Sequence, residues 1–105
     1  MELHDSDAQR LKQEFRGDTQ VVTHHYDGYQ GIKAFLPPKE RRGLVLIDSP
    51  FEQKDEFDRI VDALDTAWQR WPTGIYAAWY PLVGGRQVAA FHQMLRTRQW
   101  EEIID

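Results

Sequence analysis

Residues 44–52, LVLIDSPFE, indicate the fold class and raise the question of function. Four apolar residues lead directly to an aspartate, Asp48, which is followed by a serine, a proline and an aromatic residue. A continuous apolar run, here Gly43 to Ile47, is typical of a parallel strand that is covered on both faces of its sheet. We therefore expect a buried strand that ends on a carboxylate.

The residues after this strand suggest a binding site for an amine. In open parallel sheets, ligands bind at the carboxyl ends of the strands, where Asp48 would lie. A carboxylate and a backbone carbonyl in the turn can each accept a hydrogen bond from an exocyclic amine. Pro50 restricts the backbone of the turn, and Phe51 can stack on the ring that bears the amine. Alternatively, Asp48 caps the next helix and Phe51 packs in the core. The spacing does not decide between these interpretations.

Length and composition limit the possible classes of protein. We expect the 105 residues to form a single α/β domain, residues 1–105. A net charge of −4 does not indicate a nucleic-acid binder, although an acidic protein can carry a basic face. The lack of cysteine excludes disulfides and cysteine nucleophiles. The charged start does not resemble a signal peptide, and no apolar run approaches the ~20 residues of a membrane span, so we expect a cytoplasmic protein.

Helical and strand patterns alternate along the chain. Asp5, Ser6 and Asp7 can cap a first helix, Gly17 ends it, and apolar residues recur at steps of three and four in the later helices. Helices are expected at residues 5–16, 27–36, 54–71 and 86–98, and strands at residues 20–26, 43–47 and 74–80, with residues 101–105 able to begin another strand. This alternation predicts a parallel α/β sheet with helices on both sides.

The motif DSPF, residues 48–51, resembles the Asp-Pro-Pro-Tyr/Phe motif of S-adenosylmethionine-dependent amino-methyltransferases. Four ordered segments narrow the resemblance to the RlmJ family, the bacterial 23S ribosomal RNA adenine-N6 methyltransferases. They are ELHDSD, YDGYQGIKAFLPP, RRGLVLIDSPFE and TGIYAAWYPLV. The resemblance covers nearly the whole chain. It implies part of a Rossmann-like class I methyltransferase fold, S-adenosylmethionine as cofactor and 23S ribosomal RNA as partner.

The resemblance also implies roles for individual residues. Glu2 matches the acid that holds the cofactor ribose hydroxyls, and Asp27 with Gly28 matches the pair beside the cofactor adenine. Residues 48–51 (Asp48, Ser49, Pro50 and Phe51) match the catalytic motif. Each assignment has an alternative: Glu2 is a disordered terminal acid, and Asp27 and Gly28 are a helix cap with a permissive glycine.

Two departures from the family pattern affect what we expect of this chain. Ser49 replaces the first motif proline, so the turn is less rigid. The Gly-rich cofactor loop is missing, so the chain resembles an internal part of a methyltransferase, and we expect it to be inactive alone. Without the family's first strand, the strands around Val22 and Leu46 either pair directly in a three-stranded sheet or are completed by a second copy, giving a homo-oligomer through exposed sheet edges.

Other residues have weaker functional interpretations. Trp79 and Tyr80 follow a strand on the same sheet edge as Asp48 and could line a pocket for the target base, or simply pack. We expect no metal site, because adjacent residues such as His24 and His25 point to opposite faces of a strand. The alternative to an enzyme is a non-catalytic α/β module that binds a partner or dimerises. Another nucleotide-binding enzyme is disfavoured, because no phosphate-binding glycine loop is present.

Overall fold

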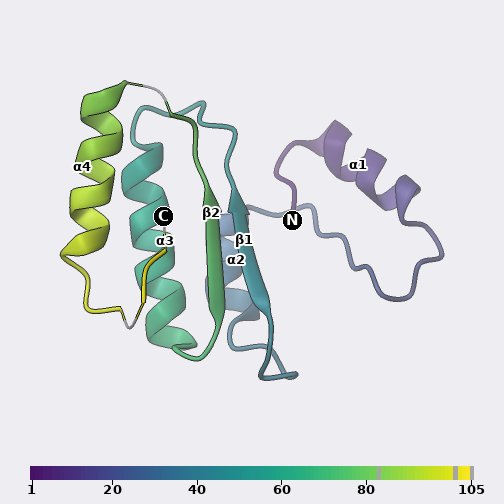
Figure 1. Cartoon of the computed structure of the whole chain (residues 1–105). Coiled ribbons are helices and arrows are strands. Elements are labelled where there is room, and N and C mark those ends of the chain that lie inside the picture. Colours follow the sequence, from purple (N-terminus) through teal and green to yellow (C-terminus); the bar gives the residue numbers. More distant parts are fainter. Residues whose placement is uncertain (83, 101, 105) are drawn as a thin grey trace. The chain divides into compact units, whose positions relative to one another are not determined.

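The computed structural model of the chain describes residues 1–82, 84–100 and 102–104. Its elements follow in the order α1, α2, β1, α3, β2 and α4 (Figure 1). The chain divides into two compact units, Met1–Leu36 and Pro37–Asp105. The first unit holds α1 and α2, and the second holds both strands with α3 and α4.

Two helices form the first unit, α1 (Asp5–Glu14) and α2 (Gly28–Phe35). Acids in the first turn of α1 stabilise its positive end, and Gly17, at a φ of 91°, lies just beyond its last turn. The predicted cap differs in detail, because His4 occupies the N-cap position and makes no side-chain capping bond. Both helices confirm the positions expected from the sequence.

The prediction of a strand at residues 20–26 is wrong. Within the described residues, this segment forms only an isolated parallel bridge between Glu2 and His25. Its β-rich composition favours extended backbone, but a strand needs a partner along several residues. Here only Glu2 provides one, by donating to the His24 carbonyl and accepting from the Tyr26 N–H, both at 3.0 Å.

The second unit is built on two parallel strands, β1 (Leu44–Asp48) and β2 (Ile75–Trp79). Their register pairs Leu44 with Ile75 at one end and Asp48 with Trp79 at the other. The two carboxyl ends therefore meet at one edge of the sheet. The α/β class and the parallel arrangement are confirmed. Of the two arrangements expected for the strands, direct pairing in a three-stranded sheet is wrong, because the sheet of the described residues has two strands.

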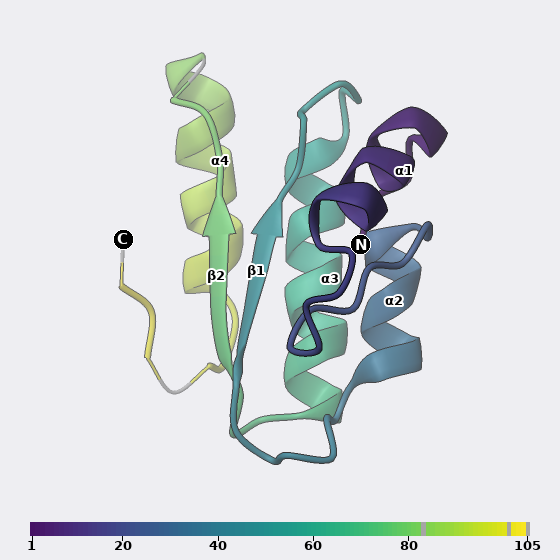
Figure 2. The same ribbon diagram turned by 90° about the vertical axis from the view of Figure 1, so that its right-hand side faces the viewer.

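Helices α3 (Glu56–Arg70) and α4 (Gly85–Arg96) lie on one face of this sheet (Figures 1 and 2). The apolar stripe of α3 forms most of the core, to which α4 contributes Phe91. The buried apolar residues of the second unit are Ile60, Val61, Ala63, Leu64, Ala67, Trp71 and Phe91. Helices α3 and α4 both confirm the positions predicted from their periodicity.

The other face of the sheet is exposed. Alternate residues of the strands, Leu44, Leu46, Ile75 and Trp79, have exposed fractions between 57% and 64%. The prediction of strands covered on both faces is therefore wrong for the described residues. Of the apolar residues in β1, only Val45 and Ile47 are turned away from this exposed face.

The last predicted strand is absent from the described part of its segment. Residues 102–104 form no strand, and residues 101 and 105 of the expected last strand lie outside the described residues. Among the helices of the described chain, none combines the length and apolar character that crossing a membrane requires.

Candidate functional site

Asp48 is the last residue of β1 and is exposed at the carboxyl edge of the sheet. The strand places it there because the apolar residues before it pair in register with β2. Its partner across the ladder is Trp79, whose side chain lies on the same exposed sheet face. A carboxylate in this position can accept hydrogen bonds from a ligand at the edge that parallel sheets commonly use for binding.

The turn after Asp48 has an unusual backbone. Ser49 is buried, and its Oγ accepts a weak hydrogen bond from the Phe51 N–H at 3.4 Å. Phe51 has a φ of 55°, in the left-handed region that bulky residues seldom adopt. Such strain occurs preferentially at functional sites, and it gives Phe51 an orientation that an ordinary extended residue would not have.

An aromatic cluster holds the ring of Phe51 on one side. Phe51 stands edge-on to Phe57, with ring centroids 4.9 Å apart. Phe57 lies 5.0 Å from Phe91, which in turn lies 4.9 Å from Tyr80. The Tyr80 hydroxyl is 2.7 Å from Nε2 of His92. The half-buried Phe51 therefore both packs against the core and belongs to the motif turn, so the two interpretations of this residue are compatible.

The two aromatic residues predicted to line a base pocket lie in different surroundings. Trp79 is exposed on the open sheet face, whereas Tyr80 packs among the rings of the aromatic cluster. Successive residues of a strand point to opposite faces, which explains the difference. Trp79 is therefore the one with its ring accessible to a ligand.

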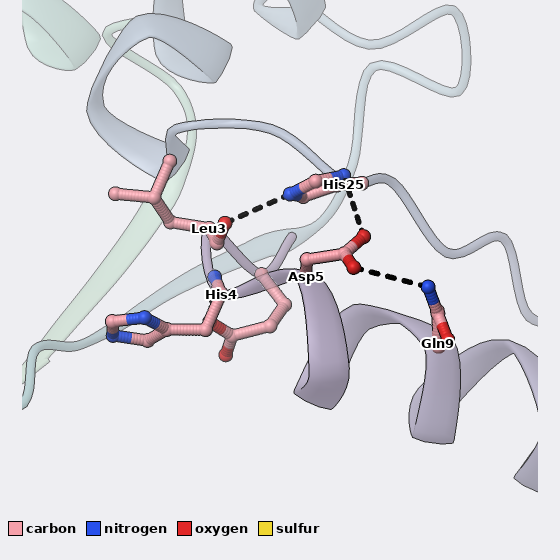
Figure 3. Close-up of polar contacts among 6 residues, drawn as sticks. Leu3, His4, Asp5, Gln9 and His25 are labelled. Atoms are coloured by element: carbon pink, nitrogen blue, oxygen red, sulfur yellow. Dashed lines mark hydrogen bonds and ion pairs between the residues drawn. The ribbon is translucent and has the colours of Figure 1, made fainter.

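Glu2 is held at both its backbone and its side chain. Its backbone forms the bridge with His25, and its carboxylate Oε1 accepts a hydrogen bond from the His4 N–H at 2.8 Å. In the same corner, the His25 ring reaches the Leu3 carbonyl, and Asp5 lies between His25 and Gln9 (Figure 3). Glu2 therefore makes both backbone and side-chain hydrogen bonds in this corner.

Asp27 and Gly28 begin α2 in the same unit as Glu2. Asp27 is the N-cap residue, and its Oδ1 accepts a hydrogen bond from the Tyr29 N–H at 2.9 Å. A Cβ placed on Gly28 would meet nothing within 4 Å, so the space above this glycine is open. The bridge of Glu2 to His25 lies two residues before Asp27, so the structure brings the three proposed cofactor residues into one unit.

Three residues that surround these sites are not evident as functional residues from the sequence. These residues are Phe57, His25 and His92. Periodicity places Phe57 on the apolar face of α3, but it carries no information about contact with Phe51. Nothing in the sequence pattern pairs His92 with Tyr80, because that contact depends on how α4 packs.

Metal-ligating side chains do not gather in the described part of the chain. No group of three or more His, Cys, Asp or Glu residues there could hold an ion. His24 packs instead against Phe35, with ring centroids 4.7 Å apart.

Comparisons with known proteins agree with the motifs. The profile of the family described as ribosomal RNA large subunit methyltransferase D, RlmJ, matches residues 1–105. A Haemophilus influenzae protein named ribosomal RNA large subunit methyltransferase J is 51% identical over 103 residues, which are 98% of this chain and 37% of that protein. The Escherichia coli protein of the same name is 45% identical over 87 residues, 83% of this chain and 31% of that protein.

A solved structure shares the fold. The crystal structure of a Legionella pneumophila protein superposes with a TM-score of 0.84 at 34% identity, covering 90% of this chain and 36% of that chain. The chain thus spans about a third of the length of the curated relatives it matches. The match along its whole length, with the DSPF turn at the carboxyl edge of the sheet, shows that the chain belongs to the RlmJ family of ribosomal RNA large subunit methyltransferases.

Proposed function

We propose that this chain forms part of an enzyme that transfers a methyl group from S-adenosylmethionine to N6 of an adenine in 23S ribosomal RNA. The observation that carries the proposal is the position of Asp48, exposed at the carboxyl end of a parallel strand and followed by the strained turn to Phe51. The names of the relatives support methylation of ribosomal RNA. The cofactor and the N6 position rest on the resemblance of residues 48–51 to the amino-methyltransferase motif.

The chemistry assigned to the turn is positioning. Asp48 accepts a hydrogen bond from one N–H of the adenine amine, and a backbone carbonyl of the turn accepts one from the other N–H. Both acceptors direct electron density toward the nitrogen, which strengthens it as a nucleophile. Phe51 stacks on the base, with its own ring held edge-on by Phe57. The proton lost from the amine passes to water, which can reach the site because Asp48 is exposed.

The residues of the first unit fit the methyl donor chemically. S-adenosylmethionine supplies an electrophilic methyl group when bound. Glu2 uses one of the roughly four lone-pair sites of its carboxylate on the His4 N–H, which leaves acceptors for two ribose hydroxyls. The open space above Gly28 admits a flat ring beside α2. The proposed fold is accordingly part of a Rossmann-like methyltransferase sheet, with its ligands at the carboxyl ends of the strands.

The test needs a full-length enzyme, because the relatives are longer than this chain. We would replace the matching segment of the Haemophilus influenzae relative with residues 1–105 and call the product the graft. The graft should methylate 23S ribosomal RNA with labelled S-adenosylmethionine. Asp48→Ala should abolish transfer and leave the melting temperature unchanged, since the side chain is exposed.

A matched control distinguishes the loss of the proposed catalytic carboxylate from the loss of a surface negative charge. Asp62→Ala removes an exposed carboxylate from α3 and should preserve the transfer rate. Normal turnover in the Asp48→Ala graft would refute the assignment of the motif. A folded graft that binds neither S-adenosylhomocysteine nor RNA would instead favour a non-catalytic module.

A further inference from the structure

We infer that His25 is a positioning residue that orients the Glu2 carboxylate for the ribose of the methyl donor. The inference rests on the proposed function of Glu2 and adds a residue to it. The contacts involved all lie within the first unit, between the segment at residues 2–5 and the segment at residues 24–26.

The central contact is a hydrogen bond from the His25 ring to the backbone. Nε2 of His25 is 2.9 Å from the Leu3 carbonyl oxygen (Figure 3). A carbonyl can only accept, so Nε2 must carry the hydrogen. Nδ1, on the other side of the ring, lies 3.7 Å from Oδ1 of Asp5. The other carboxylate oxygen of Asp5 accepts from Gln9 at 3.1 Å, which orients the carboxylate.

The Leu3 carbonyl belongs to the same peptide group as the His4 N–H. Because a peptide group is planar and trans, fixing the carbonyl also fixes the direction of the N–H, which points the opposite way. That N–H donates to Oε1 of Glu2 at 2.8 Å. His25 and Glu2 therefore bind opposite edges of one rigid peptide group. The orientation of the Glu2 carboxylate consequently depends on the imidazole of His25.

The backbone of Glu2 is anchored to the segment that carries His25. The bridge holds Glu2 from both sides, through the His24 carbonyl and the Tyr26 N–H. What the bridge does not hold is the peptide that follows Leu3, and this is the group that His25 contacts. The contact with Asp5 is an ion pair only when the ring is protonated, and because both side chains are exposed it adds little energy, so the hydrogen bond to Leu3 is the contact to test.

Substitutions of His25 can separate the two ring nitrogens. The amide nitrogen of Gln occupies about the place of Nε2, whereas that of Asn occupies about the place of Nδ1. In the graft, His25→Asn should weaken binding of S-adenosylhomocysteine by about three- to tenfold, the usual effect of losing one hydrogen bond. His25→Gln should remain within about twofold of the unmodified graft. The KM for RNA, and kcat at saturating donor, should not change in either variant.

His24→Gln is the matched control, because it changes the adjacent ring, which packs on Phe35. It should leave the donor affinity unchanged. Equal affinities in His25→Asn and the unmodified graft, with weak binding in Glu2→Gln, would overturn the inference and leave the proposed function standing. Full donor affinity in Glu2→Gln would contradict the proposed role of Glu2, and the inference with it.

A second measurement is independent of whether the variants fold. Nitrogen-15 NMR of this chain at alkaline pH reports which ring nitrogen of neutral His25 carries hydrogen. The contact with Leu3 requires the Nε2–H tautomer. An Nδ1–H tautomer would overturn the inference.

Discussion

The hydroxyl of Tyr80 lies 2.7 Å from Nε2 of His92, and this pair connects the end of β2 to α4. Tyr80 also contacts Phe57, at a centroid distance of 6.1 Å, and Phe57 supports Phe51 in the motif turn. A polar contact on α4 is thus linked through two aromatic rings, Tyr80 and Phe57, to the residue proposed to stack on the target base.

Removing the Tyr80–His92 hydrogen bond should loosen the support of Phe51. We expect Tyr80→Phe and His92→Leu in the graft each to lower kcat/KM for RNA about fivefold, which corresponds to one hydrogen bond of about 1 kcal/mol. Because both changes remove the same bond, the double variant should be no worse than the poorer single variant. Multiplied losses in the double variant would show that the residues act separately.

The aromatic ring of Phe51 should contribute more to activity on RNA than the volume of the side chain does. Phe51→Leu removes the stacking surface, and stacking of a base on an aromatic side chain contributes about 1–3 kcal/mol. We therefore expect a loss of at least about fivefold in kcat/KM for RNA, with donor affinity unchanged. Phe51→Tyr keeps the ring and should retain most of the rate. Equal activity of the Leu and Tyr variants would indicate that Phe51 serves only the core.

Tyr76 should make the stability of the chain sensitive to alkaline pH. Its hydroxyl is within hydrogen-bond distance of the Ala67 and Trp71 carbonyls, at 2.9 and 2.6 Å. Burial raises the pKa of Tyr76 above its ordinary value of 10.0. The folded state therefore retains the proton more strongly than the unfolded state does. The stabilisation is complete below pH 10 and declines as the pH rises through the folded-state pKa.

Urea unfolding of this chain tests that relationship. At pH 8, Tyr76→Phe should lower the free energy of unfolding by about 1 kcal/mol, the usual effect of one lost hydrogen bond. At pH 11, the difference between wild type and variant should shrink. A difference that is constant or grows with pH would contradict the assignment. In the graft, the same variant should leave kcat/KM for RNA unchanged, because the Tyr76 hydroxyl contacts the carbonyls of Ala67 and Trp71, which lie outside the motif turn.

The open sheet face should promote self-association of the isolated chain. Leu44, Leu46, Ile75 and Trp79 form an exposed apolar surface on adjacent strands. Size-exclusion chromatography with light scattering should show oligomers at micromolar concentration, and Leu46→Lys should reduce them. Leu82→Lys changes an exposed leucine outside the sheet and is the control. A clean monomer of the wild-type chain would contradict this expectation.

Local patterns in the sequence determined most of the secondary structure. The steps of three and four in α3 specify a helix with one apolar stripe, because the helical period places those residues on one side. The apolar runs of β1 and β2 likewise indicate parallel strands, and the carboxylate that ends β1 indicates the site edge. These features depend on neighbouring residues along the chain, so they can be predicted without knowledge of the packing.

Tertiary structure decided the features that depend on contacts between residues far apart in the sequence. Residues 20–26 have strand composition, yet they form a single bridge, because a strand requires a continuous hydrogen-bonding neighbour. The contacts of His25 with Leu3 and of His92 with Tyr80 join residues 22 and 12 positions apart. The sequence by itself determined the helices, the two strands and the motif turn. Only the packing of segments far apart in the chain decided which side chains support that turn and Glu2.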